Sequence, residues 1–224
     1  MAPQRPPRCA RPTFGGTVLV LVLIAATASA LSPVDAHAQS LTDAELALEW
    51  QVAFTAYDLV EPHGAFPRWG LRRQVSRTIS IDVNASIDYV FDAYSNIDNH
   101  VGRHALLQRV VNHREYEADG AVVREFTAIE NLPVGGLAVP INTHAQQRIY
   151  ADDHYYETDS WTAPGVITHQ LIAFEEVAPG VTRITEYLTF EAEFLLIDYT
   201  VTNGVSSHQA TLTGMKAAIE AGEF

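Results

Sequence analysis

Cysteine is almost absent from this sequence, since Cys9 is the only one among 224 residues. Cys9 precedes the uncharged run from Thr17 to Leu31, so a chain cleaved after that run contains no cysteine at all. Such a mature chain has no disulfide and no thiolate chemistry. It also has no first cysteine that could bear a lipid.

Basic residues are scarce as well, with 14 Lys and Arg against 27 Asp and Glu and a net charge of −13. Removal of residues 1–38 takes away three arginines and Asp35, which changes the net charge from −13 to −15. A strongly acidic surface repels nucleic-acid phosphates and anionic lipid head groups. We therefore expect no nucleic-acid partner and no stable membrane insertion after cleavage.

The common cofactor and nucleophile motifs are missing from the sequence. There is no G-x-S-x-G and no dinucleotide-binding fingerprint, and the glycine pair in Asn131 to Pro140 has no P-loop lysine. His100 and His104 have the i, i+4 spacing of metal ligands, but Gly102 interrupts a helix between them and no third ligand lies nearby. We expect no cofactor and no metal.

The first 38 residues have the layout of a secretory signal peptide. Arg5, Arg8 and Arg11 precede the uncharged run, and the small residues of Ala36-His37-Ala38 follow it. This pattern predicts cleavage after Ala38, with a second possible site after Ala30. The run is shorter than the roughly 20 residues of a membrane-spanning helix. The mature protein is therefore expected in the periplasm or outside the cell.

Residues 39–73 are predicted to form a helix and a connector. Thr42 and Glu45 have the spacing of a capping box, and Leu46, Trp50 and Phe54 recur at helical intervals. We expect a helix from Thr42 to Val60 and then a connector rich in proline and glycine. This helix either packs onto the following domain or binds a partner.

Residues 74–224 change to the pattern of a mostly antiparallel domain. A strand with period-two alternation leads into a short amphipathic helix capped by Ser86 and a second helical turn at Ile97 to Val101. Asp119-Gly120 and Pro179-Gly180 are hairpin signals between later strand-like segments, so we expect a meander. The six later segments are predicted at 105–117, 121–130, 143–150, 154–162, 165–177 and 181–194. A C-terminal helix follows, which Asn203-Gly204 weakens before Val205.

This order resembles the helix-grip fold of the START, Bet v 1 and polyketide cyclase superfamily over about Gln74 to Gly222. SIDVNASIDYVFDAYSNIDNH is similar to the opening strand, helix and turn of that family, and PGVTRITEYLTFE to its last hairpin turn and strand. The resemblance implies an α+β fold in which a curved antiparallel sheet wraps around the C-terminal helix. Its members include lipid carriers, hormone receptors, aromatases and cyclases, so it does not identify one activity.

Two residues are candidate catalytic acid–base groups. Alternation in the last strand places Glu186 on the same face as Leu188 and Phe190, and His208 lies on the apolar stripe of the last helix. A carboxylate and an imidazole that face one cavity from opposite walls are able to move protons. The alternatives are that Glu186 pairs with an arginine or reaches water, and that His208 is only hydrogen-bonded in the core.

Candidate ligand-binding residues lie on three strands and the last helix. They are Arg124, Phe126, Trp161, Leu188, Phe190, Leu212 and Met215. Arg124 either receives an acidic or carbonyl group of a ligand or pairs with a surface carboxylate. Periodicity does not fix which face of the Trp161 strand points inward, although we favour a solvated exterior for its neighbours Glu157 and Asp159. The apolar segment from Asn131 to Pro140 is expected to be either a loop that forms a lid or a loop buried against the N-terminal helix.

The sequence thus predicts an exported binding or transport protein for a hydrophobic small molecule, such as a lipid, sterol-like or polycyclic compound. The alternative is a cyclase or aromatase that uses Glu186 and His208. A third possibility is a filled cavity and an acidic surface that binds a partner. The volume inside the domain distinguishes the third possibility from the other two.

Overall fold

The computed structural model describes residues 41–60, 72–134, 136–162 and 165–224. The predicted signal peptide with its cleavage site, and the connector from residue 61 to 71, lie outside these residues. In the described residues, no helix has both the length and the apolar character needed to cross a membrane.

The first described element is helix α1, Asp43–Val60, as predicted. The backbone N–H of Thr42 donates to Glu45 Oε2 at 2.8 Å, and the Glu45 N–H donates to Thr42 Oγ1 at 3.3 Å. This is the predicted capping box, in which each side chain satisfies the other residue's backbone donor.

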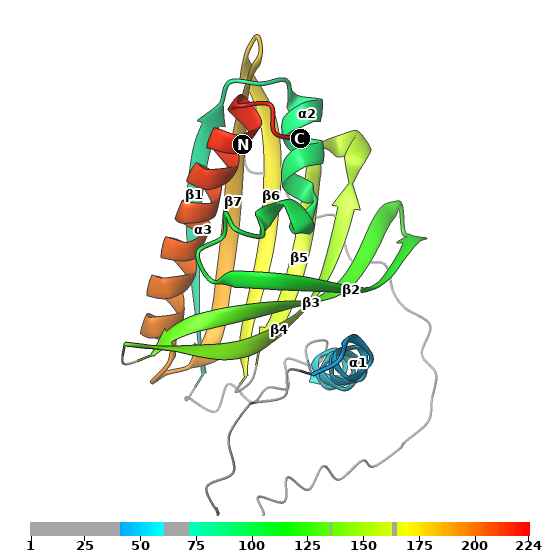
Figure 1. Cartoon of the computed structure of the whole chain (residues 1–224), viewed down its shortest axis with the longest axis vertical. Helices are drawn as coiled ribbons and strands as arrows, with labels where there is room; N and C mark the ends of the chain where they lie inside the picture. The colour runs from blue at the N-terminus through cyan, green and yellow to red at the C-terminus, as the bar shows by residue number, and fades with distance from the viewer. Residues whose placement is uncertain (1–40, 61–71, 135, 163–164) are drawn as a thin grey trace, which may run out of the picture. The chain divides into compact units, whose positions relative to one another are not determined.

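Seven strands form one curved antiparallel sheet in the order β1-β7-β6-β5-β4-β3-β2 (Figure 1). The strands are β1 Arg72–Val83, β2 Leu107–Ala118, β3 Ala121–Val134, β4 Leu137–Tyr150, β5 Tyr155–Thr162, β6 Val166–Ala178 and β7 Val181–Glu193. The strands from β2 to β7 pair in sequence order, and β1 pairs with β7. The predicted meander is confirmed, and so is the α+β fold class.

Both predicted hairpin signals form tight turns. Asp119 and Gly120 connect β2 to β3 with φ angles of 52° and 79°, which is typical of a type I′ turn. Gly180, with a φ of 71°, lies in the turn between β6 and β7.

The segment from Asn131 to Pro140 is not the loop that we predicted. β3 runs to Val134 and β4 begins at Leu137, so most of the segment is a strand hairpin. Its backbone continues the β3–β4 ladder, with Asn131 opposite Pro140. The glycine pair misled the prediction because it marks only the turn of a longer hairpin.

Three helical elements lie on one face of the sheet, which we call the inner face (Figure 1). They are α2, Ile87–Ser95; the 3-10 helix η2, Ile97–His100; and α3, Ile197–Glu220. The first two agree with the prediction, although the Ser86 side chain makes no capping hydrogen bond. α3 begins eight residues earlier than the predicted Val205.

Gly204 explains the error in the start of α3. A Cβ atom at this position would lie 2.5 Å from Cε1 of Phe190 on β7. Glycine lowers helix propensity, but here its missing side chain lets α3 approach the sheet closely.

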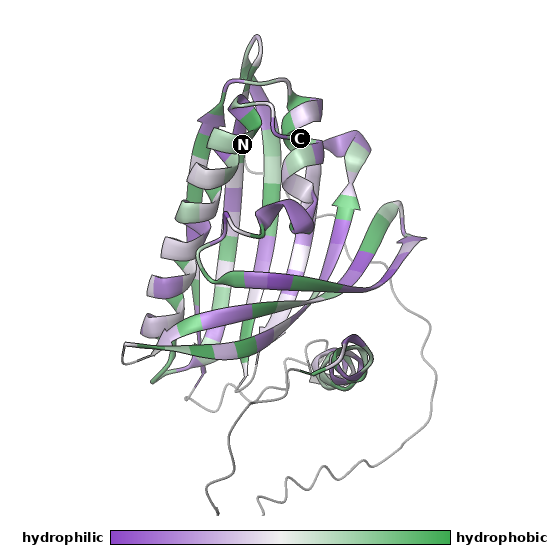
Figure 2. Ribbon diagram, viewed as in Figure 1, coloured by the Kyte–Doolittle hydropathy of each residue, from purple (hydrophilic) through white to green (hydrophobic). Residues whose placement is uncertain are grey.

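The main core lies between the inner face and the helices. Its largest cluster joins side chains of α2, the sheet and α3, among them Tyr94, Ile184 and Met215. Hydrophobic and hydrophilic residues alternate along many strands, as Figure 2 shows. The alternation buries one face of each strand and leaves the other for water or for α1.

Helix α1 packs on the opposite, outer face of the sheet. Trp50 is 4% exposed, its ring lies 5.9 Å from that of Trp161 on β5, and its indole N–H donates to the backbone carbonyl of Ala145 at 2.9 Å. Phe54 and Tyr57 complete this aromatic cluster. The expectation that the helix packs onto the domain is confirmed within the described residues.

Candidate functional site

A cavity of about 370 Å³ lies between the inner face of the sheet and α3. One wall is built by α3, which contributes His208 and Ser207. The other is built by the inward-facing residues of β3 to β7, which alternate along each strand as in Phe126, Ala128 and Glu130. We call these the helix wall and the strand wall. The cavity rules out a completely filled interior.

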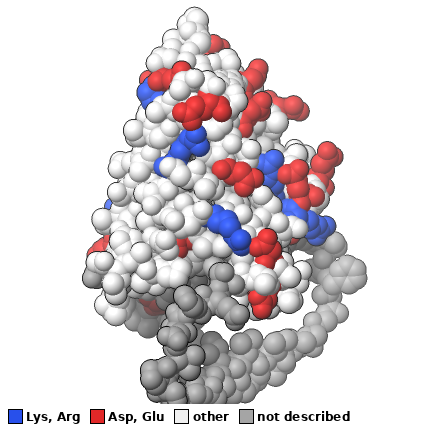
Figure 3. Space-filling model, viewed as in Figure 1, with Lys and Arg blue, Asp and Glu red and all other residues white. Residues whose placement is uncertain are grey.

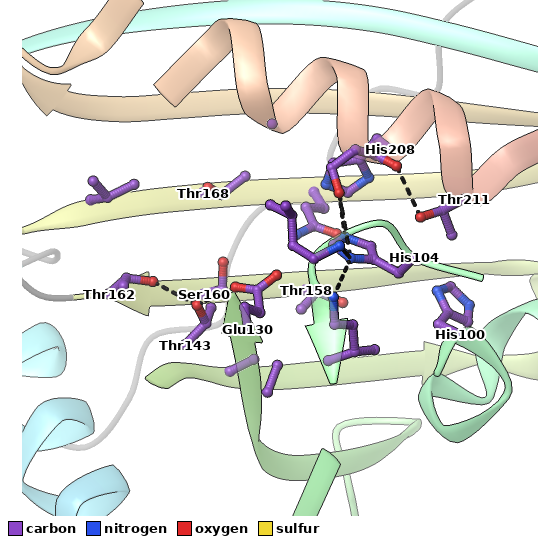
Figure 4. A pocket seen from close by; sticks show the side chains of 18 of the residues that line it. His100, His104, Glu130, Thr143, Thr158, Ser160, Thr162, Thr168, His208 and Thr211 are labelled. Atoms are coloured by element: carbon purple, nitrogen blue, oxygen red, sulfur yellow. Dashed lines mark hydrogen bonds between the residues drawn. The ribbon is translucent and has the colours of Figure 1, made fainter. Parts of the chain in front are cut away.

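The strand wall combines apolar side chains with a series of hydroxyl groups. On β5 the inward-facing residues are Thr158, Ser160 and Thr162, and Thr168 follows on β6 (Figure 4). Within the described part of the chain, the hydroxyls of Thr158, Ser160 and Thr168 make no hydrogen bond, so they are available to a ligand or to water.

Glu186 is the most deeply buried charged residue of the cavity, with 2% of its surface exposed. Its Oε1 accepts a hydrogen bond of 2.5 Å from the Tyr94 hydroxyl, and its Oε2 lies 2.7 Å from Nδ1 of His208. The carboxyl group therefore joins α2, β7 and α3 in one polar chain inside an apolar core. Such a group is tolerated in the interior because both of its oxygens are paired.

The Tyr94–Glu186–His208 hydrogen-bond chain shifts the pKa values of both partners of Glu186. Burial, reinforced by the adjacent carboxylate, raises the pKa of the Tyr94 hydroxyl, so Tyr94 stays a donor. Burial alone would lower the pKa of His208, but the charge of Glu186 and the hydrogen bond to it raise it above 6.5. His208 is thus the cavity imidazole that most readily carries a positive charge.

His104 is held in the neutral state. Burial, with His208 and His100 nearby, lowers the pKa of His104 to about 3. The backbone N–H groups of Leu106 and Leu107 point at its Nδ1, at 3.3 and 3.1 Å. Because an N–H can only donate, Nδ1 is the acceptor and Nε2 bears the proton that is donated to Ser207 Oγ at 3.1 Å.

His100 is also buried, and its Nε2 lies 2.7 Å from the carbonyl oxygen of Tyr94, to which it donates. Burial lowers its pKa. The hydrogen bonds of His100 and His104 therefore hold the backbone and side chains that surround the Tyr94–Glu186–His208 hydrogen-bond chain. Within the described residues, no group of three His, Cys, Asp or Glu side chains is placed to hold a metal ion.

Glu130 is a second carboxyl group in the cavity, on the strand wall. Its Oε2 accepts a 2.5 Å hydrogen bond from the Thr143 hydroxyl, which in turn accepts one of 3.0 Å from Thr162. Burial raises the pKa of Glu130, and this effect outweighs the opposing influences of Thr143 and His208.

Gln147 adds an acceptor without a partner. The side chain is 2% exposed, and its Nε2 donates to the carbonyl oxygen of Ser95 at 3.0 Å. Its Oε1 is buried and has no hydrogen-bond partner, although the residue lines the cavity. A buried acceptor of this kind requires a donor from a ligand or from water.

Comparison with known proteins yields a fold and no sequence relative. No protein-family model and no curated protein sequence matches the chain. The protein TTHA0849 from Thermus thermophilus is similar with a TM-score of 0.53 at 10% identity, over 67% of this chain and 100% of its own. The di-domain ARO/CYC BexL from the BE-7585A biosynthetic pathway is similar with a TM-score of 0.52 at 15% identity, over 66% of this chain and 50% of its own.

This is the helix-grip fold. The resemblance inferred from the sequence is therefore confirmed as a statement about fold. Identities of 10% and 15% establish the arrangement of the chain and not an activity.

The helix-grip cavity brings together four of the nine predicted site residues. Glu186, His208, Phe126 and Phe190 line it. Leu188 packs beside Phe190 in a core cluster with Ala192 and Ile197, outside the cavity lining.

Leu212 and Met215 lie farther along α3, in the main core cluster between α2 and the sheet. They hold the helix to the sheet but do not line the cavity. Their stripe was predicted correctly as inward-facing, yet only the N-terminal half of α3 faces the hollow part of the interior.

Arg124 and Trp161 lie away from the cavity lining. Arg124 Nε donates to Glu115 Oε2 on β2 at 2.5 Å, which is the carboxylate pair that we gave as the alternative. Trp161 faces the opposite side of the sheet, where it stacks on Tyr57 of α1. Glu157 and Asp159 share that outer face and both contact Arg148.

Among the polar cavity residues that were not predicted from the sequence are Tyr94, His104 and Glu130. Tyr94 was not singled out, because it lies on the apolar side of the predicted short helix, and His104 was considered only as a metal ligand. Glu130 continues the alternation of Phe126 and Ala128, so its inward direction was readable from the strand period. We ended the strand at Glu130 because of the glycine pair beyond it.

On the surface, acidic and basic side chains are interspersed, and the face shown in Figure 3 has no continuous basic area. Several of the basic groups are paired, as Arg183 is with Asp82 at 2.7 Å.

Proposed function

We propose that this protein is exported and binds a hydrophobic small molecule in the cavity between the sheet and α3. The observation that supports this most is a cavity of about 370 Å³ lined by apolar side chains and hydroxyl groups, with a buried Tyr94–Glu186–His208 chain that ends on its helix wall. Proteins of this fold family bind hydrophobic small molecules. Export is supported by the signal-like residues 1–38.

The volume and the lining indicate the kind of ligand. Small-molecule sites commonly occupy roughly 300–1,000 Å³, so this cavity suits a compact ligand such as a polycyclic compound. Burial of its apolar surface contributes roughly 25 cal/mol per Å². His208 and the hydroxyls of the strand wall then fix its orientation.

Native mass spectrometry of the protein purified from its own host tests the proposal. We expect one noncovalently bound small organic molecule per chain, which is released when the protein unfolds. The same sample tests export, because the mature protein is expected in the periplasmic or extracellular fraction and should begin at Gln39. A full-length chain in the cytoplasm would contradict export. A chain that never carries a ligand and takes up no apolar probe would contradict binding.

A cyclase or aromatase activity is the second candidate, because the His208–Glu186 pair faces the cavity. When Nδ1 of His208 is hydrogen-bonded to Glu186, the protonated ring presents its Nε2–H to the cavity. This group can protonate or polarise a ligand carbonyl. Incubation with a synthetic linear polyketone tests this. Faster formation of cyclised product by the wild type than by His208→Gln would support the enzyme, and equal rates would refute it.

A further inference from the structure

The hydrogen bond from Thr143 does not explain why the carboxyl group of Glu130 lies inside the cavity. It lines the cavity among apolar residues that include Leu132 and Ile141, and within the described residues no arginine or lysine pairs with it. A carboxylate without a cationic partner is costly in such a place. Burial therefore raises the pKa of the Glu130 carboxyl group and shifts its equilibrium toward the neutral acid.

The direction of the hydrogen bonds defines which oxygen of Glu130 is free. Thr162 donates to Thr143, and Thr143 donates to Oε2 of Glu130. Oε2 is therefore the acceptor, and the acid proton belongs on Oε1. Within the described part of the chain, Oε1 has no hydrogen-bond partner, so its O–H is available to a ligand.

The opposite wall supplies a second donor. His208 projects from α3, and its Nδ1 is engaged by Glu186, which leaves Nε2–H when the ring is protonated. In Figure 4, His208 lies at the helix wall while Glu130, Thr143 and Ser160 lie together at the strand wall. The remaining titratable side chains that line the cavity are Tyr94, His100, His104, Tyr156, Glu186 and Tyr199.

We propose that the cavity selects flat polycyclic ligands with hydrogen-bond-accepting oxygens on two opposite edges, one bound by His208 and the other by the neutral carboxyl group of Glu130. Glu130 is thus a specificity-determining residue. This inference rests on the proposed binding function and adds to it the chemical class of the ligand. A ligand with an acceptor on one edge only leaves one of the two donors unpaired, which costs affinity.

A matched series of three tricyclic probes tests the inference: anthracene without a ketone, anthrone with one, and anthraquinone with two on opposite edges. Affinities are measured by displacement of a neutral fluorescent apolar probe. We expect each added ketone to strengthen binding roughly three- to tenfold. Equal affinities for all three would overturn this inference and leave the proposed binding function standing. Absence of binding by all three and by the fluorescent probe would overturn both.

Two variants isolate the role of Glu130. Glu130→Leu removes the donor and should weaken anthraquinone roughly three- to tenfold without weakening anthracene. Glu130→Gln keeps an N–H donor and cannot ionise, so it should bind anthraquinone within about twofold of the wild type. Equal anthraquinone affinity in wild type and Glu130→Leu would overturn the assignment.

Infrared difference spectroscopy gives a readout that needs no ligand. The wild-type protein at neutral pH should show the carbonyl stretching band of a neutral carboxylic acid, and Glu130→Gln should lack it. A band of equal size in both proteins, or in neither, would show that Glu130 is not the neutral donor. Thermal unfolding of each variant establishes that the comparison is made on folded protein.

Discussion

Glu186 connects the main elements of the domain interior through its hydrogen bonds. Its two oxygens are held by Tyr94 from α2 and His208 from α3, so one carboxyl group links the sheet to both helices. Removal of either partner leaves part of a buried carboxyl group unsatisfied, which costs more than the hydrogen bond itself contributes.

Tyr94→Phe tests this link on the α2 side. The change removes only the hydroxyl donor and should lower the free energy of unfolding by about 1.5–3 kcal/mol, the range for hydrogen bonds to charged groups. Tyr89→Phe is the matched control on the same helix, because the Tyr89 hydroxyl donates a hydrogen bond to the backbone carbonyl of the exposed residue Phe224. It should cost about 0.5 kcal/mol or less. Equal losses by urea denaturation in the two variants would contradict the role given to Tyr94.

His208 makes the stability depend on pH. Its pKa in the folded protein lies above 6.5, so its contribution to stability is complete below that value and is lost as the pH rises through the folded pKa. His104 acts in the opposite direction, since its pKa of about 3 makes stability fall as the pH drops below 6.5. Urea denaturation of wild type and His208→Gln at several pH values should show that only the wild type loses stability on the alkaline side of neutrality. The same alkaline loss in both proteins would contradict this assignment.

Part of this site was readable from the sequence because the strand period is two. The parity of β7 placed Glu186 inward, and the stripe of α3 placed His208 opposite to it. The partner Tyr94 was not predicted, because the position of a tyrosine on an apolar stripe does not show which group its hydroxyl will contact. Trp161 was ambiguous because both faces of β5 are polar and aromatic, and only the packing of α1 decides between them.

Among the elements, α3 forms the helix wall of the cavity, and its packing sets how closely that wall approaches the sheet. Gly204 allows that approach, since a side chain there would enter the space of Phe190. The ring forms part of the cavity lining, so its displacement also changes the shape of the cavity.

Gly204→Ala should therefore lower the free energy of unfolding by about 1–3 kcal/mol, despite a gain in helix propensity of about 1 kcal/mol. Gly214→Ala on the same helix is the control, because its Cβ would lie no closer than 3.3 Å to Arg103. It should be close to neutral. A larger loss for Gly214→Ala than for Gly204→Ala, measured by chemical denaturation, would refute the close-approach explanation.

Helix α1 stabilises the sheet from the outside without touching the cavity. Trp50→Ala should cost about 3–5 kcal/mol, the range for a buried large aromatic side chain. The emission of Trp161 should then shift to longer wavelength as it becomes exposed to water. Binding of an apolar probe in the cavity should stay within about twofold of the wild type.

Leu48→Ala is the control for α1, since Leu48 is 63% exposed. It should change stability by no more than about 0.5 kcal/mol. If Trp50→Ala abolished probe binding while the protein remained folded, the separation between the outer helix and the cavity would be wrong.

The architecture as a unit was the most predictable part of the protein. Hairpin turns at Asp119-Gly120 and Pro179-Gly180 fix an antiparallel meander, and a meander with one long final helix has few ways to bury its apolar face. The volume left inside was not predictable, because it depends on which side chains interdigitate. Leu212 and Met215 fill their part of the interior, whereas Ser207 and His208 face an open one.

The most direct measurement is the binding of a neutral fluorescent probe, N-phenylnaphthylamine, to the wild type and to two variants whose cavity is filled, Ala128→Phe and Ser160→Phe. Both positions line the strand wall. We predict one probe molecule per wild-type chain and binding at least roughly tenfold weaker in both variants, with each variant shown to be folded by circular dichroism. Equal probe affinity in all three proteins, or no binding by the wild type, would contradict a hollow interior that holds an apolar molecule.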